Sequence, residues 1–284
     1  RDLESALAEV WGRRLGSVFF GGGTPSVFSA QSIDKILTAV RMLLPLEPYA
    51  EVTLEANPGT FEAQKFKDFR AAGINRLSIG IQSFSPEKLQ ALGRIHGRAE
   101  ALRAAEMARA AGFDNFNLDL MHGLPGQSLQ EAVADITQAI ALGPTHLSWY
   151  QLTIEPNTAF GSRPPVLPED ETLWDIQEQG HQLLLDAGYQ QYEISAYAKP
   201  GFECRHNLNY WQFGDYLGIG CGAHGKITLP QENRIIRTAK VKHPKGYLDP
   251  ERAFLDQSWN VENEDRPFEY FMNRMRLFQP VPKA

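Results

Sequence analysis

The apolar residues of this 284-residue chain recur with two periods, which alternate along most of the sequence. Short apolar runs bounded by glycine, proline or polar residues predict β-strands, and apolar residues three or four positions apart predict helices. The predicted strands are 17–20, 51–56, 76–82, 116–121, 146–152 and 189–197. The predicted helices are 1–14, 30–43, 61–72, 86–92, 99–111, 129–142, 169–187 and 268–277.

This alternation of strands and helices through short connections predicts a parallel sheet. Six such strands in order favour a partial (β/α) barrel over an open sheet, although periodicity does not separate the two. Beyond Lys199 the alternation stops, and glycine, aromatic residues and asparagine dominate as far as Gly225. The sequence therefore predicts an α/β fold with a barrel region at 1–198. A C-terminal extension at 199–284 follows it and ends in the beginning of a helical region.

The composition narrows the function classes without choosing between enzymes and binding proteins. Hydrophobic residues make up 43% and charged residues 22% of the chain, which is ordinary for a globular protein. The net charge of −6 and the lack of a basic block argue against a nucleic-acid partner. No apolar run is long enough to span a bilayer, and no signal peptide opens the chain. Cys204 and Cys221 form no disulfide framework, so a cytoplasmic location is expected.

Glycines and polar residues follow several predicted strands at the point where each strand ends. Active sites of (β/α) barrels lie at these carboxyl ends. In chain order, the strand ends carry Gly21-Gly22-Gly23-Thr24, Glu55, Gln82, Asp119 and Tyr150. Each polar residue could cap the helix that follows it, and the glycines could serve only a turn that needs positive φ. Packing alone does not explain polar residues at successive strand ends, so together they favour a ligand site.

The residue types at the strand ends indicate the class of ligand. Two carboxylates, an amide and bare backbone suit a ligand with an ammonium group and vicinal hydroxyls, such as an amino acid joined to a nucleoside. No strand end carries a lysine, which argues against Schiff-base chemistry, and no zinc-binding spacing of histidines occurs. Arg94 could pair with the carboxylate of such a ligand, or it could be a solvated charge at a helix end.

Five motifs occur in an order that is more specific than any one of them. They are Gly-Gly-Gly-Thr-Pro-Ser at 21–26, Glu-Ala-Asn-Pro-Gly at 55–59, Arg-Leu-Ser-Ile-Gly-Ile-Gln-Ser-Phe at 76–84, Leu-Gly-Arg-Ile-His at 92–96 and Asn-Leu-Asp-Leu-Met-His-Gly-Leu-Pro at 117–125. With these motifs the chain closely resembles the radical S-adenosylmethionine (SAM) proteins related to oxygen-independent coproporphyrinogen III oxidase. Within that group it is most similar to the HemW-type heme chaperones, and the resemblance covers nearly the whole chain.

The resemblance implies that seven residues near the strand ends bind SAM. Gly22, Gly23 and Thr24 are implied for the methionine end of SAM, and Glu55 is implied for a ribose. The remaining contacts are implied for Gln82, Arg94 and Asp119. The last three could also contact a second SAM, as in the oxidase.

The same resemblance implies a [4Fe–4S] cluster for which this chain lacks cysteine ligands. In the family, Cys-x-x-x-Cys-x-x-Cys follows a first strand that precedes the glycine strand. Here only an incomplete helix precedes the glycine strand, and Cys204 and Cys221 lie far downstream. As written, the chain cannot supply three thiolates to a cluster. We expect residues upstream of Arg1 to be disordered or removed, and the C-terminal helical region to be cut short after Ala284.

A histidine followed by aromatic residues stands out in the C-terminal extension, within Glu-Cys-Arg-His-Asn-Leu-Asn-Tyr-Trp at 203–211. Histidine ligates heme iron, and tyrosine and tryptophan present flat faces to a porphyrin. Taken alone, a histidine beside aromatic residues is more often a core residue. However, His-Asn-x-x-Tyr-Trp looks like the segment linked to heme binding in the heme-chaperone branch. The resemblance therefore implies His206, Tyr210 and Trp211 as heme residues, with Cys204 as a rival iron ligand.

The leading hypothesis is a binding protein that holds heme on a radical SAM scaffold and delivers it to respiratory enzymes. The alternative is an enzyme that oxidatively decarboxylates coproporphyrinogen III with SAM and the cluster, so whether the chain is an enzyme is left open. A (β/α) enzyme unrelated to SAM would need a phosphate or metal constellation that the sequence does not contain. The expected partners are heme and heme-accepting respiratory proteins, including a membrane-associated acceptor, and a homodimer is also considered.

Overall fold

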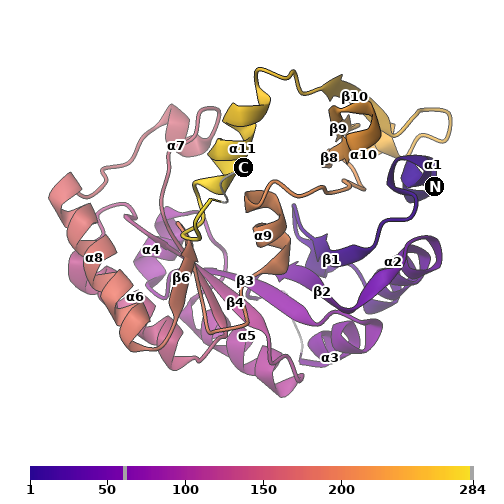
Figure 1. The fold of residues 1–284 in the computed structure, drawn as a ribbon. Helices are drawn as coiled ribbons and strands as arrows, with labels where there is room; N and C mark the ends of the chain where they lie inside the picture. The colour runs from indigo at the N-terminus through magenta and orange to yellow at the C-terminus, as the bar shows by residue number, and fades with distance from the viewer. Residues whose placement is uncertain (60–62, 282–284) are drawn as a thin grey trace. The chain divides into compact units, whose positions relative to one another are not determined.

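The main element of the computed structural model, which describes residues 1–59 and 63–281, is a curled sheet of seven strands (Figure 1). The strands are β1 (Leu15–Phe20), β2 (Leu46–Ala56), β3 (Arg76–Gln82), β4 (Phe116–His122), β5 (His146–Gln151), β6 (Gln190–Glu193) and β7 (Ala196–Ala198). Their spatial order is β1-β2-β3-β4-β5-β7-β6. From β2 to β5 the strands run parallel, so their carboxyl ends meet at one edge of the sheet. This arrangement confirms the predicted partial (β/α) barrel.

The helices agree with the hydrophobic periodicity to within one to four residues at most ends. They are α1 (Asp2–Val10), α2 (Ala30–Leu43), α3 (Ala63–Ala72), α4 (Pro86–Ala91), α5 (Arg98–Ala110), α6 (Leu129–Ala141), α7 (Ala159–Ser162), α8 (Asp170–Asp186), α9 (Arg205–Trp211), α10 (Pro244–Tyr247) and α11 (Arg266–Arg274). The first two residues of the helix predicted at 61–72 lie outside the described residues. The short helices α7, α9 and α10 were not predicted, because four to seven residues are too few to show a helical period.

The last strand predicted for the barrel, at 189–197, is a hairpin and not one parallel strand. β6 and β7 pair antiparallel, and β7 also pairs antiparallel with β5. A turn at Ile194 and Ser195 separates the two strands, and the Ser195 amide donates to the Glu193 carboxylate at 2.9 Å. The prediction of a sixth parallel strand was wrong because the apolar residue Ile194, which continues the strand pattern in the sequence, lies exposed in the turn.

The two faces of the parallel strands differ in polarity. Successive side chains of a strand point to opposite faces. On the outer face, the pairing register sets Leu54 beside Leu77, and it sets Ile79, Leu118 and Leu147 in one row. All five are fully buried. Helices α3, α5, α6 and α8 lie along this outer side of the curl (Figure 1). The inner face, opposite these helices, carries the polar side chains of the candidate site.

The chain divides into two compact units. The barrel unit comprises Val18–Leu37 and Glu51–Cys204, and the three-strand unit comprises Arg1–Ser17, Thr38–Ala50 and Arg205–Ala284. The division predicted from the sequence, between residues 198 and 199, stays a prediction.

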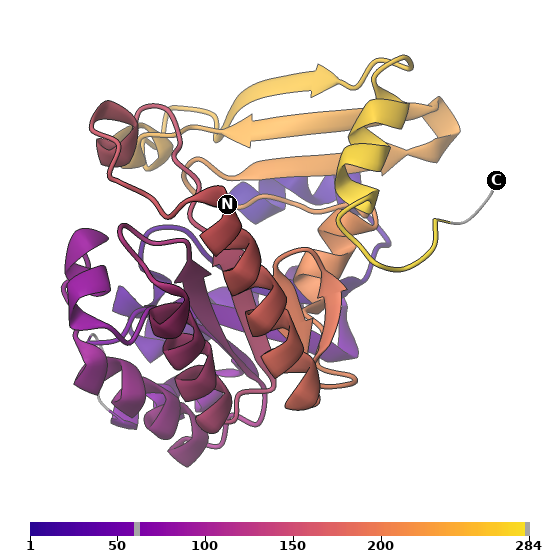
Figure 2. The same ribbon diagram turned by 90° about the vertical axis from the view of Figure 1, so that its left-hand side faces the viewer.

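An antiparallel sheet that the sequence pattern did not predict is the main feature of the three-strand unit. It contains β8 (His224–Leu229), β9 (Arg234–Lys240) and β10 (Leu255–Asn260) in the order β10-β9-β8. Figure 2 shows the strands side by side, with α11 lying against them. Arg237 of β9 pairs with Glu269 of α11 at 2.5 Å. The pattern failed here because β10 is exposed along its whole length and shows no alternation of buried and exposed residues.

The first helix is shorter than the predicted range 1–14. α1 ends at Val10, and Gly12 adopts φ +79°, a left-handed conformation that glycine adopts without strain. Val10 packs with Leu44 and Ile227 in the core of the three-strand unit. Trp11, predicted on the same apolar face, is instead 80% exposed. Across the part of the chain that the structure describes, no helix combines the length and apolar character needed to cross a bilayer.

One close approach between α8 and the outer face is directly testable. A Cβ on Gly180 would lie 2.0 Å from the Trp149 ring, which is buried. Alanine favours a helix over glycine by about 1 kcal/mol, but overpacking costs about 1–3 kcal/mol. We therefore expect Gly180→Ala to lower the free energy of unfolding in urea. Gln179→Ala, on the exposed side of the same helix, is the control and should change it little. A Gly180→Ala protein as stable as the wild type would contradict this packing.

Candidate functional site

The inner face of the sheet gathers half-buried polar side chains near the carboxyl ends of four parallel strands. The pairing register sets Glu55 beside Ser78, and Gly80 beside Asp119. Asp119 is also paired with Ser148 of β5. Since paired residues in a parallel sheet share a face, both carboxylates point to the inner side. The burial patterns agree, because Glu55, Asp119 and Ser148 are accessible between buried neighbours.

The glycine turn after β1 lies against Glu55. The Gly22 amide donates to Glu55 Oε2 at 3.0 Å. Gly22 and Gly23 have φ of +81° and +59°, so side chains at these positions would be strained. A Cβ on Gly21 would lie 3.3 Å from the Glu55 carboxyl carbon and 2.6 Å from the Phe19 ring. The absence of side chains is therefore what lets this backbone lie beside a carboxylate.

A second close approach connects the glycine turn with β3. Asn57 Nδ2 donates to Thr24 Oγ1 at 3.4 Å. A Cβ on Gly80 would lie 3.1 Å from both Asn57 Oδ1 and Gln82 Nε2, so the two side-chain amides lie on either side of a bare backbone position. Thr24, Asn57 and Gln82 thus form one polar edge.

Gln82 has an uncommon backbone conformation at the end of β3. Its φ is +69°, and the pairing with β4 shifts register between Gly80 and Gln82, which marks a β-bulge. Bulges and left-handed non-glycine residues occur often at functional sites, where they re-aim a side chain. The bulge turns the Gln82 amide so that Oε1 accepts from the Tyr150 hydroxyl at 3.2 Å. Asp135 of α6 holds the next turn, since it accepts from Ser83 Oγ at 2.5 Å.

Arg94 is exposed in the loop after α4, and its electrostatic effect reaches Tyr150. His96 fixes this loop, because its Nε2 donates to the Ile81 carbonyl at 3.0 Å. Burial raises the pKa of Tyr150 to about 12, with Asp119 adding to the shift and Arg94 opposing it. The hydroxyl of Tyr150 therefore stays protonated, and it lies within the fields of both charged groups.

The two carboxylates of the inner face are less acidic than usual. Burial raises the pKa of Glu55, the Gly22 amide opposes this, and the negative charge of Asp119 adds to it. Burial also raises the pKa of Asp119, although hydrogen bonds from Asn117, Ser148 and Ser78 favour its charged form. A ligand with an ammonium group or hydroxyl donors would stabilise both carboxylates, which agrees with the ligand class expected from the sequence.

The candidate heme residues lie on α9 in the three-strand unit. His206 and Tyr210 are one helical turn apart, with ring centroids 4.8 Å apart in an edge-to-face arrangement. Tyr210 also contacts Tyr216 at 4.3 Å, and Arg237 donates to the Tyr216 hydroxyl at 2.7 Å. The Arg276 guanidinium lies 4.3 Å from the Trp211 ring centroid and covers one of its faces.

The cysteines do not form a cluster site. Cys204 is 1% exposed, and its thiol lies 3.5 Å from Glu51 Oε1. Cys221 is exposed and donates to the Lys242 carbonyl at 2.7 Å. Within 1–59 and 63–281, no group of three His, Cys, Asp or Glu side chains could hold a metal ion. The residues present therefore do not fit a [4Fe–4S] cluster, whereas the glycine turn and the two carboxylates fit SAM.

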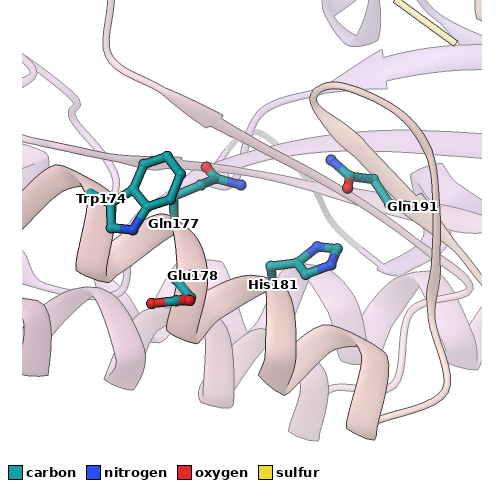
Figure 3. A pocket seen from close by; sticks show the side chains of 5 residues that line it. All are labelled: Trp174, Gln177, Glu178, His181 and Gln191. Atoms are coloured by element: carbon teal, nitrogen blue, oxygen red, sulfur yellow. The ribbon is translucent and has the colours of Figure 1, made fainter. Parts of the chain in front are cut away.

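A cavity of about 220 Å³ lies apart from these residues in the sequence and in the fold. Figure 3 shows its lining side chains, four from α8 and one from β6, which are Trp174, Gln177, Glu178, His181 and Gln191. None of these residues lies at the end of a predicted strand or in one of the five motifs. The candidate site is thus defined by the strand ends and not by this cavity.

Sequence reasoning missed residues that act through others. Asn57 and Asn117 both lie in motifs given above but were not selected, and Asn117 precedes Asp119 by two positions. Two-residue spacing within a strand was the available signal for Asn117, because it puts both side chains on one face. No sequence pattern indicates that Tyr150 bonds to Gln82, which lies 68 positions away.

Comparison with known proteins gives one consistent result. A family model described as the radical SAM superfamily matches residues 1–139. The heme chaperone HemW of Escherichia coli is 61% identical over 283 residues, or 100% of this chain and 74% of that protein. The heme chaperone HemW of Haemophilus influenzae is 60% identical over 282 residues, or 99% of this chain and 73% of that protein.

The fold has a counterpart among solved structures. Coproporphyrinogen III oxidase (HemN) from Escherichia coli, a radical SAM enzyme, matches with a TM-score of 0.79 over 97% of this chain and 68% of that one. The sequence identity is 22%, so this likeness concerns the fold alone.

Gly80→Ala tests whether the two amides beside this glycine serve a ligand. The added Cβ would press on Asn57 and Gln82, so we expect SAM to bind about tenfold more weakly, equivalent to about 1.4 kcal/mol. Isothermal titration with SAM would measure this. Gly16→Ala is the matched control, because its Cβ would make only an ordinary 3.6 Å contact with Glu47. Equal affinities of Gly80→Ala and wild type would argue against this edge as part of the site.

Proposed function

Because the chain belongs to the HemW family of the radical SAM superfamily, we propose that it is a heme-binding chaperone that delivers heme to respiratory enzymes. The observation that carries this proposal is the His206–Tyr210 pair on one face of α9. The names of the relatives in Escherichia coli and Haemophilus influenzae support it.

His206 is the proposed ligand of the heme iron. Its side chain is half-buried, and an imidazole nitrogen is a common axial ligand. Burial raises the pKa of Tyr210 to about 12, so at neutral pH this residue offers an aromatic face and not a phenolate. Cys204, the alternative iron ligand considered from the sequence, is buried in the barrel unit, and its thiol contacts the Glu51 carboxylate. These features favour the histidine.

Trp211 is proposed to contact heme with one ring face only. The other face carries Arg276, an arrangement that also ties α9 to the segment after α11. The tilted ring of Tyr216, which contacts Tyr210, extends the aromatic surface beside His206. A porphyrin has a large apolar face that such a surface suits.

In the barrel unit, we propose that the seven residues implied by the family bind SAM. The backbone of Gly22 and Gly23 and the Thr24 hydroxyl would accommodate the methionine end, and Glu55 would accept hydrogen bonds from a ribose. Gln82, Arg94 and Asp119 would complete the contacts, with the exposed guanidinium of Arg94 suited to a carboxylate. When bound, SAM would be a charged ligand that contacts the glycine turn, β2, β3 and β4 at the same time.

No radical step is part of this proposal. Reductive cleavage of SAM needs an electron from an iron–sulfur cluster, and the cysteines of these 284 residues do not fit one. The oxidase alternative is not proposed, because its support is a fold likeness at 22% identity. What the barrel residues do in the proposal is bind and orient SAM.

The proposed partners follow from this function. Heme is the cargo, and respiratory heme proteins, including membrane-associated ones, are the proposed acceptors. A homodimer that shares the flat heme surface is a further part of the proposal. Cys204 and Cys221 are not joined in a disulfide, which supports a reducing, cytoplasmic location.

His206→Ala tests the heme ligand. Loss of the axial ligand should weaken heme binding at least about tenfold, or about 1.4 kcal/mol, and should change the Soret band. Heme titration followed by absorbance measures both. His243→Ala, an exposed histidine of the same unit, is the control and should leave both unchanged. If His206→Ala keeps the affinity and spectrum of the wild type while remaining folded, His206 is not the ligand.

A further inference from the structure

The carboxylate of Asp119 is held by polar side chains of the inner face, among them Asn117 and Ser78. Asn117 Nδ2 donates to Asp119 Oδ1 at 2.7 Å, and Ser78 Oγ donates to Oδ2 at 3.2 Å. Asn117 Nδ2 also donates to Ser78 Oγ at 2.8 Å. The shortest of these contacts, to Oδ1, therefore depends on which way the Asn117 amide faces.

The oxygen of the Asn117 amide is surrounded by donors, which sets its orientation. The Ser148 backbone amide donates to Asn117 Oδ1 at 2.9 Å, and Ser148 Oγ donates to it at 3.2 Å. Reversal of the amide would set its NH₂ group against the Ser148 N–H and turn its oxygen toward the carboxylate of Asp119. Both contacts are unfavourable at a site where Asn117 is 2% exposed.

His146 supplies the shortest contact to that oxygen. Its Nδ1 lies 2.6 Å from Asn117 Oδ1, and its Nε2 lies 2.7 Å from the Tyr192 hydroxyl. Burial, together with the charge of Arg76, lowers the pKa of His146 well below its usual value, so the ring is neutral at pH 7. An amide oxygen only accepts, so the single ring proton resides on Nδ1 and Nε2 accepts from Tyr192.

The far end of this hydrogen-bonded chain lies at Cys204. Burial raises the pKa of Tyr192, which keeps its hydroxyl protonated. That hydroxyl accepts from the Cys204 amide at 3.3 Å and donates to His146. Donation thus runs in one direction, from the Cys204 backbone through Tyr192, His146 and Asn117 to Asp119, and every member belongs to the barrel unit.

We propose that His146 is a positioning residue for Asp119, acting through the Asn117 amide. By donating from Nδ1, it keeps the Asn117 oxygen turned away and its NH₂ group directed at the carboxylate. Asp119 is then fixed before a ligand binds, which reduces the ordering needed on binding. This inference rests on the proposed function, because it takes Asp119 as part of the SAM site.

Two substitutions test the roles of the two ring nitrogens of His146 separately. The side-chain amide of His146→Asn can reach the place of Nδ1 and retain a donor to Asn117. That of His146→Gln reaches the place of Nε2, so it retains a partner for Tyr192 and loses the donor to Asn117. We expect His146→Asn to bind SAM within about threefold of wild type and His146→Gln to bind about tenfold more weakly.

Tyr192→Phe is the control for stability. It removes the hydroxyl that donates to Nε2 but leaves the Nδ1 contact, so it should lower the unfolding temperature without changing SAM affinity. Isothermal titration with SAM and thermal unfolding would be measured for all four proteins. If both His146 variants lose affinity equally, or if affinity follows stability across the series, His146 is only a structural residue and the proposal is wrong.

A second readout does not need SAM. The carboxyl carbon of Asp119 can be followed by NMR as pH is lowered, and loss of the Asn117 donor should raise the pKa of Asp119 in His146→Gln but not in His146→Asn. Arg76 and Glu55 also act on Asp119, and both are unchanged in these variants. If wild type fails to bind SAM, the proposed SAM site fails. Identical titrations of Asp119 in all the proteins would overturn the positioning role.

Discussion

A carboxylate on the inner face of a largely apolar sheet needs hydrogen-bond donors, and Asp119 receives them from three strands. Ser78 comes from β3, Asn117 from β4 itself, and Ser148 from β5. The parallel register makes this possible, because Asp119 is level with both Gly80 and Ser148. A shift by one residue would turn these polar side chains toward the helices and the leucines toward the inner face.

Positions without side chains let the polar groups of the site come together. Gly21 leaves space for the Glu55 carboxyl, and Gly80 leaves space for two amides. Gly180 does the same on the outer face, where α8 lies against Trp149. The inner edge is consequently rich in acceptors, and Arg94 is an exposed cation whose charge acts on Tyr150. Such an edge suits a small ligand that carries both charges and hydroxyls.

In the three-strand unit, residues from other segments support the short helix that carries His206 and Tyr210. His206 and Tyr210 belong to a helix of seven residues, too short to be stable alone. Tyr216, Arg237 and Glu269 form the support next to it, through ring contact, hydrogen bond and ion pair. The motif could be selected from the sequence by resemblance, whereas these supports come from the segment before β8, from β9 and from α11, and have no recognisable spacing from it.

The sequence by itself determined the alternation of helices and strands and the polar residues at the strand ends, because both depend on local periodicity and on chain order. It did not reveal the hairpin of β6 and β7, the sheet of β8 to β10, or the shorter α1. In those places exposure and turn geometry override the pattern, as at Ile194 and Trp11. Only the tertiary structure decided which polar groups meet. Tyr150 reaches Gln82 across β4, and Tyr192 reaches His146 across β7, because the sheet brings together strands that are distant in the chain. Hydrogen bonds act over ångströms and not over sequence positions.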